Sequence, residues 1–171
     1  DALPVVLSGP DQAKNRERLH AVKEADGLLV VLAALDVAEP AALIAAAKNP
    51  LDSLRAEFLI ADLGIVEKRV EKLRVQVTKP TSYQAQDKKE LALLERLLPH
   101  LSDGKPVADC PMTEDEKRLL KGFRFISEKP VLVALNIPET LLAESKALAQ
   151  GLAGRDPVVV LSAKLELELA Q

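Results

Sequence analysis

Two apolar, β-branched runs in the chain end abruptly in polar side chains that could contact a ligand. The run 130–135 is followed by Asn136 and Glu139, and the run 158–161 is followed by Ser162. Buried parallel strands have this composition, and their carboxyl ends deliver loops to one edge of a sheet. An Asn amide donates and accepts hydrogen bonds, and a carboxylate accepts them from amino or ring N–H groups. These residue types suit the recognition of a nucleotide base.

A simpler interpretation of the same residues stays open at this point. Asn136 could cap a helix that begins at Pro138, with Glu139 in its first turn. The segment 162–164, Ser-Ala-Lys, could equally be an ordinary turn between a strand and a helix. Spacing alone does not separate a base site from these local roles.

The elements that would position these residues are strands alternating with helices. Strands are predicted at 3–8, 27–35, 130–136 and 157–161, with helices in the connections between them. A helix is expected over 39–48, and Asn49-Pro50 is expected to break it. The order predicts a mostly parallel α/β sheet that is interrupted by a long helical insertion.

The insertion is predicted from a change in hydrophobic period between residues 51 and 101. Apolar residues spaced alternately by four and three predict two helices that pack along a coiled-coil seam, joined by a polar turn at 79–82. Thr113 and Glu116 then have the spacing of a capping box that opens another helix. The seam residues are Leu59, Leu63, Val66, Val70, Leu73 and Val77 in the first helix and Leu91, Leu94, Leu98 and Leu101 in the second.

The far end of this predicted hairpin is basic. Residues 67–89 contain seven basic and three acidic side chains, in a chain whose net charge is −3. A protruding basic arm can contact the phosphates of RNA, whereas a solvated helix face is the commoner explanation of such a run. The candidate contacts are Lys68, Arg69, Lys72, Arg74, Lys79, Lys88 and Lys89.

Composition excludes several classes of protein. Aromatic residues make up 2% of the chain, so it is expected to lack the aromatic platforms used for stacking on single-stranded nucleic acid. One cysteine excludes an internal disulfide and a Cys-based zinc site. Two isolated histidines form no metal motif, and no catalytic constellation can be assigned. No apolar run approaches the roughly 18 residues of a membrane span, and no signal peptide is evident, so the expected compartment is the cytoplasm.

Three segments together resemble the YchF/Obg-like ATPase family, over about Ala25 to the C-terminus. The first, 49–69, is similar to the family's entry into its coiled-coil insertion, and the second, 104–130, to the exit from it. The third combines Asn-Ile-Pro-Glu at 136–139 with Ser-Ala-Lys at 162–164. The resemblance implies a partial P-loop-NTPase-like domain at 1–48 and 126–171, with the helical insertion at 49–125.

The resemblance also implies a function and a site. The family binds and hydrolyses ATP or GTP with magnesium and associates with ribosomes, so a translation-linked, nucleotide-binding protein is expected. The implied base-binding residues are Asn136, Ile137, Glu139, Ser162 and Ala163.

The departures from the family pattern concern the phosphates. No Gly-x-x-x-x-Gly-Lys-Ser/Thr occurs, and no Asp-x-x-Gly magnesium motif stands near 7–10. The chain is expected to be a central portion that lacks the P-loop and the C-terminal TGS domain, with no tightly bound cofactor and no hydrolysis of its own. The alternative function is a non-enzymatic module whose basic hairpin binds RNA, the ribosome or a protein.

Overall fold

The computed structural model describes residue 20 and residues 22–171, and the strand predicted at 3–8 lies outside these described residues. The chain forms two compact units. One comprises Ala25–Leu54 and Pro130–Gln171, and the other contains Arg55–Lys129 together with the described residues before Ala25.

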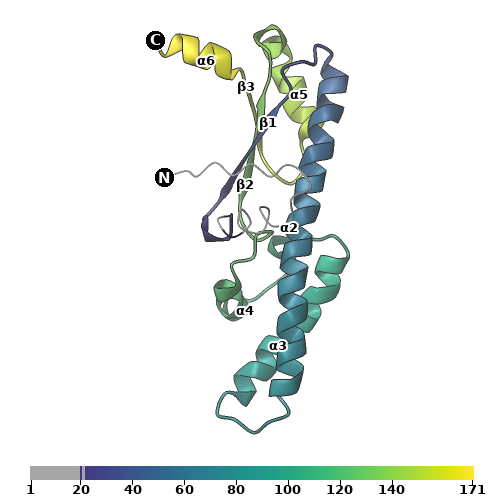
Figure 1. Cartoon of the computed structure of the whole chain (residues 1–171), viewed down its shortest axis with the longest axis vertical. Coiled ribbons are helices and arrows are strands. Elements are labelled where there is room, and N and C mark those ends of the chain that lie inside the picture. Colours follow the sequence, from purple (N-terminus) through teal and green to yellow (C-terminus); the bar gives the residue numbers. More distant parts are fainter. Residues whose placement is uncertain (1–19, 21) are drawn as a thin grey trace. The chain divides into compact units, whose positions relative to one another are not determined.

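The first unit is built on a three-stranded parallel sheet. Strands β1 (Leu28–Ala33), β2 (Val131–Asn136) and β3 (Val158–Leu161) lie in the order β1-β2-β3, and both neighbouring pairs are parallel. The strands are rich in Val and Leu, which favour the pleated, packed surface of a sheet. The α/β class with parallel strands that the sequence predicts is confirmed (Figure 1).

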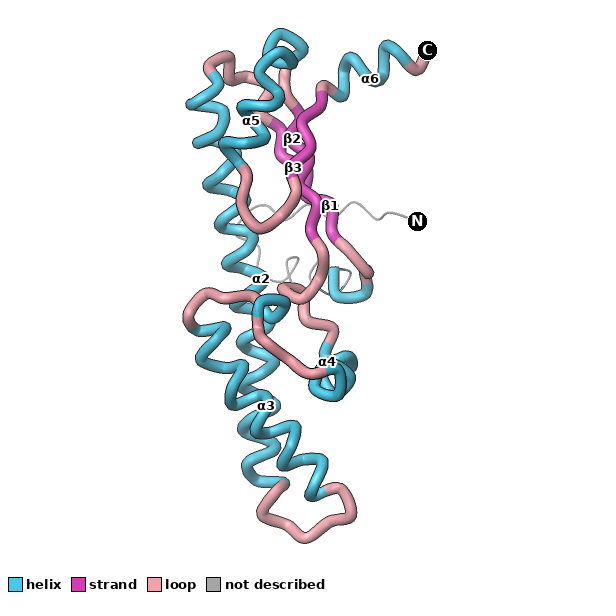
Figure 2. Tube along the Cα trace, turned by 180° about the vertical axis from the view of Figure 1, so that it is seen from behind, coloured by secondary structure: helices cyan, strands magenta, loops and turns pink. Residues whose placement is uncertain are grey.

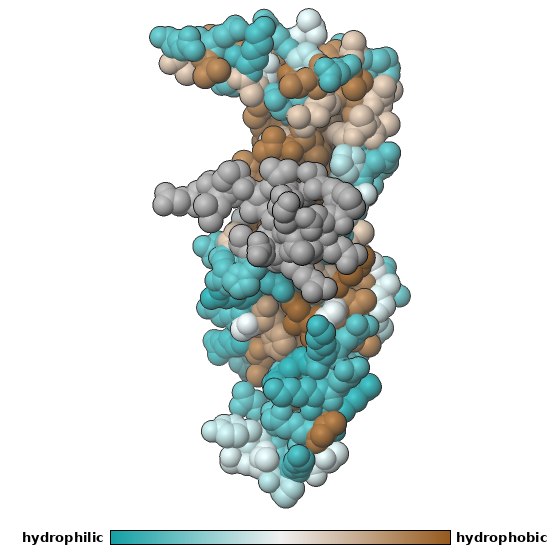
Figure 3. Space-filling view, viewed as in Figure 1, coloured by the Kyte–Doolittle hydropathy of each residue, from teal (hydrophilic) through white to brown (hydrophobic). Residues whose placement is uncertain are grey.

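One face of the sheet packs on helices and the other is exposed. Val133 and Leu135 of β2 are fully buried, and Leu135 packs with Leu43 and Leu148 from two helices. Side chains alternate between faces along a strand, so the intervening positions point to the opposite side. Leu29, Val31, Leu132 and Val159 there are 62%, 62%, 38% and 46% exposed. Brown apolar atoms over the strands are visible in Figure 3.

The connection from β1 begins a single long helix, α2 (Pro40–Gln76), rather than two helices. The predicted break at Asn49-Pro50 is therefore wrong. Proline lacks the N–H that would bond to the preceding turn, and inside a helix this costs about 3 kcal/mol. The buried side chains Leu43, Ala47 and Leu51 lie on both sides of Pro50 along one helix face and offset that cost.

The second unit contains the predicted helical hairpin. The distal part of α2 runs beside α3 (Gln84–Ser102), and residues 77–83 join them, as Figures 1 and 2 show from opposite sides. Val66, Val70 and Leu73 are buried against α3 as the spacing predicts. The α3 residues buried in the shared core are Leu93, Leu94, Leu97 and Leu101, of which Leu93 and Leu97 are not among the predicted positions.

A short return segment follows the hairpin. It comprises the 3₁₀ helices η1 (Val107–Asp109) and η2 (Lys121–Phe123) on either side of α4 (Glu114–Leu120). The predicted capping box is confirmed, because the Thr113 side chain accepts from the Glu116 N–H and the Glu116 carboxylate accepts from the Thr113 N–H.

A buried carboxylate of α2 fixes the end of the return segment. Asp62 is fully buried and accepts hydrogen bonds from the backbone N–H groups of Ile126 (3.0 Å) and Ser127 (2.7 Å). The Ser127 hydroxyl in turn accepts from the Val107 N–H at 3.1 Å. These contacts satisfy buried backbone donors a few residues before β2 begins.

The carboxyl-terminal elements complete the sheet unit. A helix predicted from about Pro138 begins instead as the 3₁₀ helix η3 (Glu139–Glu144) and continues as α5 (Ser145–Leu152), and α6 (Ala163–Leu169) follows β3. In the part of the chain that the structure describes, no helix is both long and apolar enough to cross a membrane.

Candidate nucleotide-base site and the helical hairpin

The carboxyl ends of β2 and β3 meet at one edge of the sheet. Asn136, the last residue of β2, is in register with Leu161, the last residue of β3. The Ile137 N–H continues the ladder by donating to the Leu161 carbonyl at 2.9 Å. The two polar segments predicted from sequence, which begin at Asn136 and Ser162, therefore leave the sheet side by side.

Asn136 joins the two segments through its side chain. Its Oδ1 atom accepts a hydrogen bond from the Ala163 N–H at 2.9 Å, and its carbonyl accepts from the Ala34 N–H at 3.1 Å. The alternative role, a cap on the following helix, is not found, because η3 has no side-chain cap and Pro138 stands at its N-cap position. The bond to Ala163 fixes the amide so that its Nδ2 group faces away from that N–H.

The other predicted site residues differ in their exposure to solvent. The Ile137 side chain is 1% exposed and belongs to the core of the sheet unit, so only its backbone can contribute to a site. Ser162 is 3% exposed, and its carbonyl accepts from the Glu166 N–H in the first turn of α6. Glu139 and Ala163 are exposed. The edge therefore has buried supports and two accessible residues beside Asn136.

Metal ligands are not gathered in the part of the chain that the structure describes. No group of three or more His, Cys, Asp or Glu side chains lies close enough there to hold a metal ion.

The predicted basic residues of the hairpin fall into two classes. Arg69 forms a bidentate pair with Glu90 across the helices, with Nε–Oε1 and Nη2–Oε2 distances of 2.6 and 2.8 Å. Arg74 pairs with Glu95 at 2.8 Å. The hydrogen bonds that Arg69 donates to Glu90 raise the pKa of Arg69, since the carboxylate favours the charged guanidinium. Both arginines connect α2 to α3, which the sequence did not predict.

Five lysines of the predicted set remain exposed, and these are Lys68, Lys72, Lys79, Lys88 and Lys89. Sequence analysis could not separate them from the arginines, because Arg69 and Glu90 lie 21 residues apart along the chain. It also did not single out Tyr83, whose side chain is 68% exposed at the start of α3. A tyrosine between two polar residues carries no signal of exposure by itself.

The sheet, its crossover connections and the loops at its carboxyl edge define a partial α/β fold of the P-loop-NTPase kind. The structure of the YchF GTPase of Schizosaccharomyces pombe is similar, with a TM-score of 0.70 and 21% sequence identity, over 89% of this chain and 44% of that one. At this identity the likeness establishes the fold.

Sequence comparison also finds relatives that carry the name YchF. The chain is 27% identical over 133 residues to the ribosome-binding ATPase YchF of Bacillus subtilis, with 72% of this chain and 35% of that protein covered. It is 26% identical over 127 residues to the protein of the same name from Haemophilus ducreyi, with 72% and 34% covered. No family model matches the chain.

The resemblance to the YchF/Obg-like family over part of the family protein is confirmed. The chain spans about a third of the length of the bacterial relatives that it matches.

Proposed function

We propose that this chain is part of a translation-associated protein that binds ATP or GTP, and that it holds the base at the edge formed by β2 and β3. The observation that carries the proposal is the hydrogen bond from the Ala163 N–H to Asn136 Oδ1, at 2.9 Å. It ties together the two segments whose sequences resemble the base-binding loops of the family. The relatives named as ATPases and a GTPase support this class of ligand.

The geometry suggests how the base would be held. Asn136 Oδ1 is already occupied, so the Nδ2 group is the one that can donate to a ring nitrogen or carbonyl of a base. The exposed Glu139 carboxylate can accept from an exocyclic amino group or a ring N–H. Ile137 and Ser162 would support the site through the backbone, since both are buried. Adenine and guanine each offer both kinds of partner.

We further propose that the two predicted domains have different functions. The NTPase-like portion, 1–48 and 126–171, would bind the base, and 49–125 would form the arm. ATP or GTP would carry magnesium in the whole protein. Residues 1–171 alone would not hydrolyse it, because the sequence contains no Gly-x-x-x-x-Gly-Lys-Ser/Thr to position the phosphates. The proposed compartment is the cytoplasm, where the ribosome works.

The experiment is a titration of the isotopically labelled chain with ATP and with GTP, followed by amide NMR. Shifts are expected at Ile137 and Ala163. Glu139→Gln, a change at an exposed position, is expected to weaken binding about tenfold, because a charged carboxylate acceptor for a base N–H is replaced by a neutral amide with a single acceptor oxygen. Glu144→Gln, also exposed, is the matched control and should leave binding unchanged. Shifts confined to other residues, or equal affinities for both variants, would contradict the proposed site.

A second candidate function rests on the hairpin. The charges of Arg69 and Arg74 are balanced by Glu90 and Glu95. The remaining exposed charges at this end are five lysines and two carboxylates, Glu67 and Glu71, so the surface is cationic. Such a surface suits a polyanion. Because the bacterial relatives are named ribosome-binding, we propose RNA of the ribosome as its partner. Binding that falls steeply as salt is raised would support this role, and salt-independent binding would oppose it.

A further inference from the structure

The end of the hairpin carries positive but no negative side chains. Residues 72–86 contain Lys72, Arg74 and Lys79 and no Asp or Glu. The next carboxylate, Asp87, is 6% exposed and accepts from the Gln76 amide at 2.9 Å, so it does not balance this charge at the surface. Figure 3 shows the hairpin end, at the bottom of the view, as mostly teal and pale.

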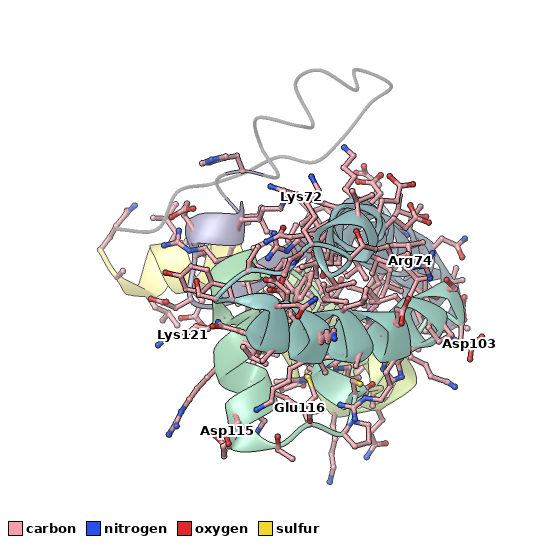
Figure 4. All side chains as sticks on the ribbon, turned by 90° about the horizontal axis from the view of Figure 1, so that it is seen from below. Lys72, Arg74, Asp103, Asp115, Glu116 and Lys121 are labelled. Carbon is pink, nitrogen blue, oxygen red and sulfur yellow. The ribbon has the colours of Figure 1, made fainter. Side chains whose placement is uncertain are left out.

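Two negative side chains lie close to this end: Glu95 pairs with Arg74 at 2.8 Å, and the exposed Glu71 precedes Lys72 in the sequence. The unpaired positive charge of residues 72–86 is therefore that of Lys72 and Lys79. The acidic cluster of the return segment lies elsewhere. In the view along the hairpin in Figure 4, Lys72 lies on one side of the helices, and Asp115 and Glu116 of the return segment lie on the opposite side. Glu116 is bound there to Arg96 at 2.9 Å. The acidic start of α4 is therefore separated from the cationic end, which leaves that end free to attract an anion.

The turn at this end is held by its own polar contacts. The Gln84 amide donates to the Val77 carbonyl at 2.8 Å, and the Thr78 hydroxyl donates to the Val75 carbonyl at 2.8 Å. The Gln84 N–H also donates to the Thr81 carbonyl at 3.2 Å. The first of these acceptors after the helix is Val77, whereas the Val75 carbonyl lies in the last turn of α2. None of the three bonds uses the Tyr83 side chain.

Tyr83 presents a single exposed aromatic ring at this turn. This ring departs from the expectation, drawn from the 2% aromatic content, that the chain has no surface for stacking on single-stranded nucleic acid. The Tyr83 carbonyl accepts from the Asp87 N–H at 2.9 Å, whereas its side chain is 68% exposed. The described phenylalanines Phe123 and Phe125 instead stack on each other, with ring centroids 5.3 Å apart. Lys79 is also exposed and belongs to the same connection, 77–83. Proteins bind unpaired nucleotides with an exposed ring that stacks on the base and cationic side chains that pair with phosphates.

We infer that the end of the hairpin binds single-stranded RNA, with a base stacked on Tyr83 and adjacent phosphates on Lys72 and Lys79. This inference rests on the proposed polyanion-binding role of the hairpin. RNA is favoured over a protein partner because the surface is cationic and hydroxyl-rich, and Val75 is the one large aliphatic side chain that is strongly exposed on its described residues 72–86.

The test uses the full 171-residue chain and a labelled oligouridine of about 12 nucleotides, within the range of known single-strand sites. Fluorescence anisotropy at several salt concentrations gives the affinity and its salt slope. Tyr83→Ala is expected to weaken binding about tenfold without changing the slope, and Tyr83→Phe to retain it. Lys72→Gln with Lys79→Gln should reduce the slope by about 1.4, which is about 0.7 for each lost phosphate contact.

Matched controls separate the possible outcomes. Lys48→Gln with Lys146→Gln removes two exposed lysines of the sheet unit and should change nothing. If Lys72→Gln with Lys79→Gln weakens RNA binding but the Tyr83→Ala variant binds with unchanged affinity, stacking is refuted and the polyanion-binding role is supported. If no RNA binds, both fail. If a helical RNA duplex or polyglutamate competes as well as oligouridine, single-strand recognition is overturned, in the latter case in favour of an acidic protein partner.

Discussion

Replacing Asp62 by Ala tests whether one buried carboxylate holds the return segment to the long helix. Asp62 is fully buried and accepts from the N–H groups of Ile126 and Ser127, residues that are 0% and 9% exposed. Each buried N–H left without an acceptor costs about 1–3 kcal/mol, so two cost about 2–6 kcal/mol. The variant no longer bears the cost of burying a carboxylate, which offsets part of this loss. We therefore expect the free energy of unfolding to fall by about 2–4 kcal/mol in total.

The assay is urea unfolding followed by circular dichroism, which suits a chain without tryptophan. Hydrogen exchange gives a local measurement, because the amides of Ile126 and Ser127 should lose protection selectively in the variant. Asp103→Ala is the control. Its carboxylate is 65% exposed and lies 3.3 Å from Lys105, a surface pair worth about 0–1 kcal/mol. A loss below about 1 kcal/mol in Asp62→Ala, with both amides still protected, would refute the reasoning.

The same residue predicts a dependence of stability on pH. Burial raises the pKa of Asp62 above its ordinary value of 3.8, and the hydrogen bonds from Ile126 and Ser127 oppose the rise. Because the folded-state pKa is the higher one, this group's contribution to stability is complete below 3.8 and is lost as pH rises through the folded-state pKa. The destabilisation by Asp62→Asn should therefore be larger in acid than at neutral pH, and the opposite trend would contradict this assignment.

Two further predictions concern the hairpin and the sheet. Arg69→Ala should lower the free energy of unfolding by about 2–3 kcal/mol, because it leaves the mostly buried Glu90 unpaired, whereas Arg74→Ala, at an exposed pair, should cost about 1 kcal/mol or less. Equal costs in urea titrations would show that burial does not distinguish the pairs. Val133→Ala should cost about 2 kcal/mol and Val159→Ala under about 1 kcal/mol, since they are 0% and 46% exposed. The reverse order would mean that the face now exposed is covered in solution.

Sequence patterns predicted the features that depend on near neighbours along the chain. Near-continuous apolar runs of Val and Leu predict strands at 27–35, 130–136 and 157–161, and the observed strands 28–33, 131–136 and 158–161 agree to within one or two residues. The spacing of Val66, Val70 and Leu73 predicted the face of α2 that is buried. The capping box at Thr113 is likewise local, because both of its hydrogen bonds join residues three apart.

The partners of polar side chains were decided by tertiary structure. Asn136 reaches Ala163 across 27 positions, and Asp62 reaches Ser127 across 65, because the parallel register and the return segment bring them together. Pro50 stays inside a helix because burial of Leu43 and Ala47 before it and of Leu51 after it outweighs its local preference. Residue type states which hydrogen bonds a side chain can make, whereas only the fold decides which partner is within about 3 Å of it.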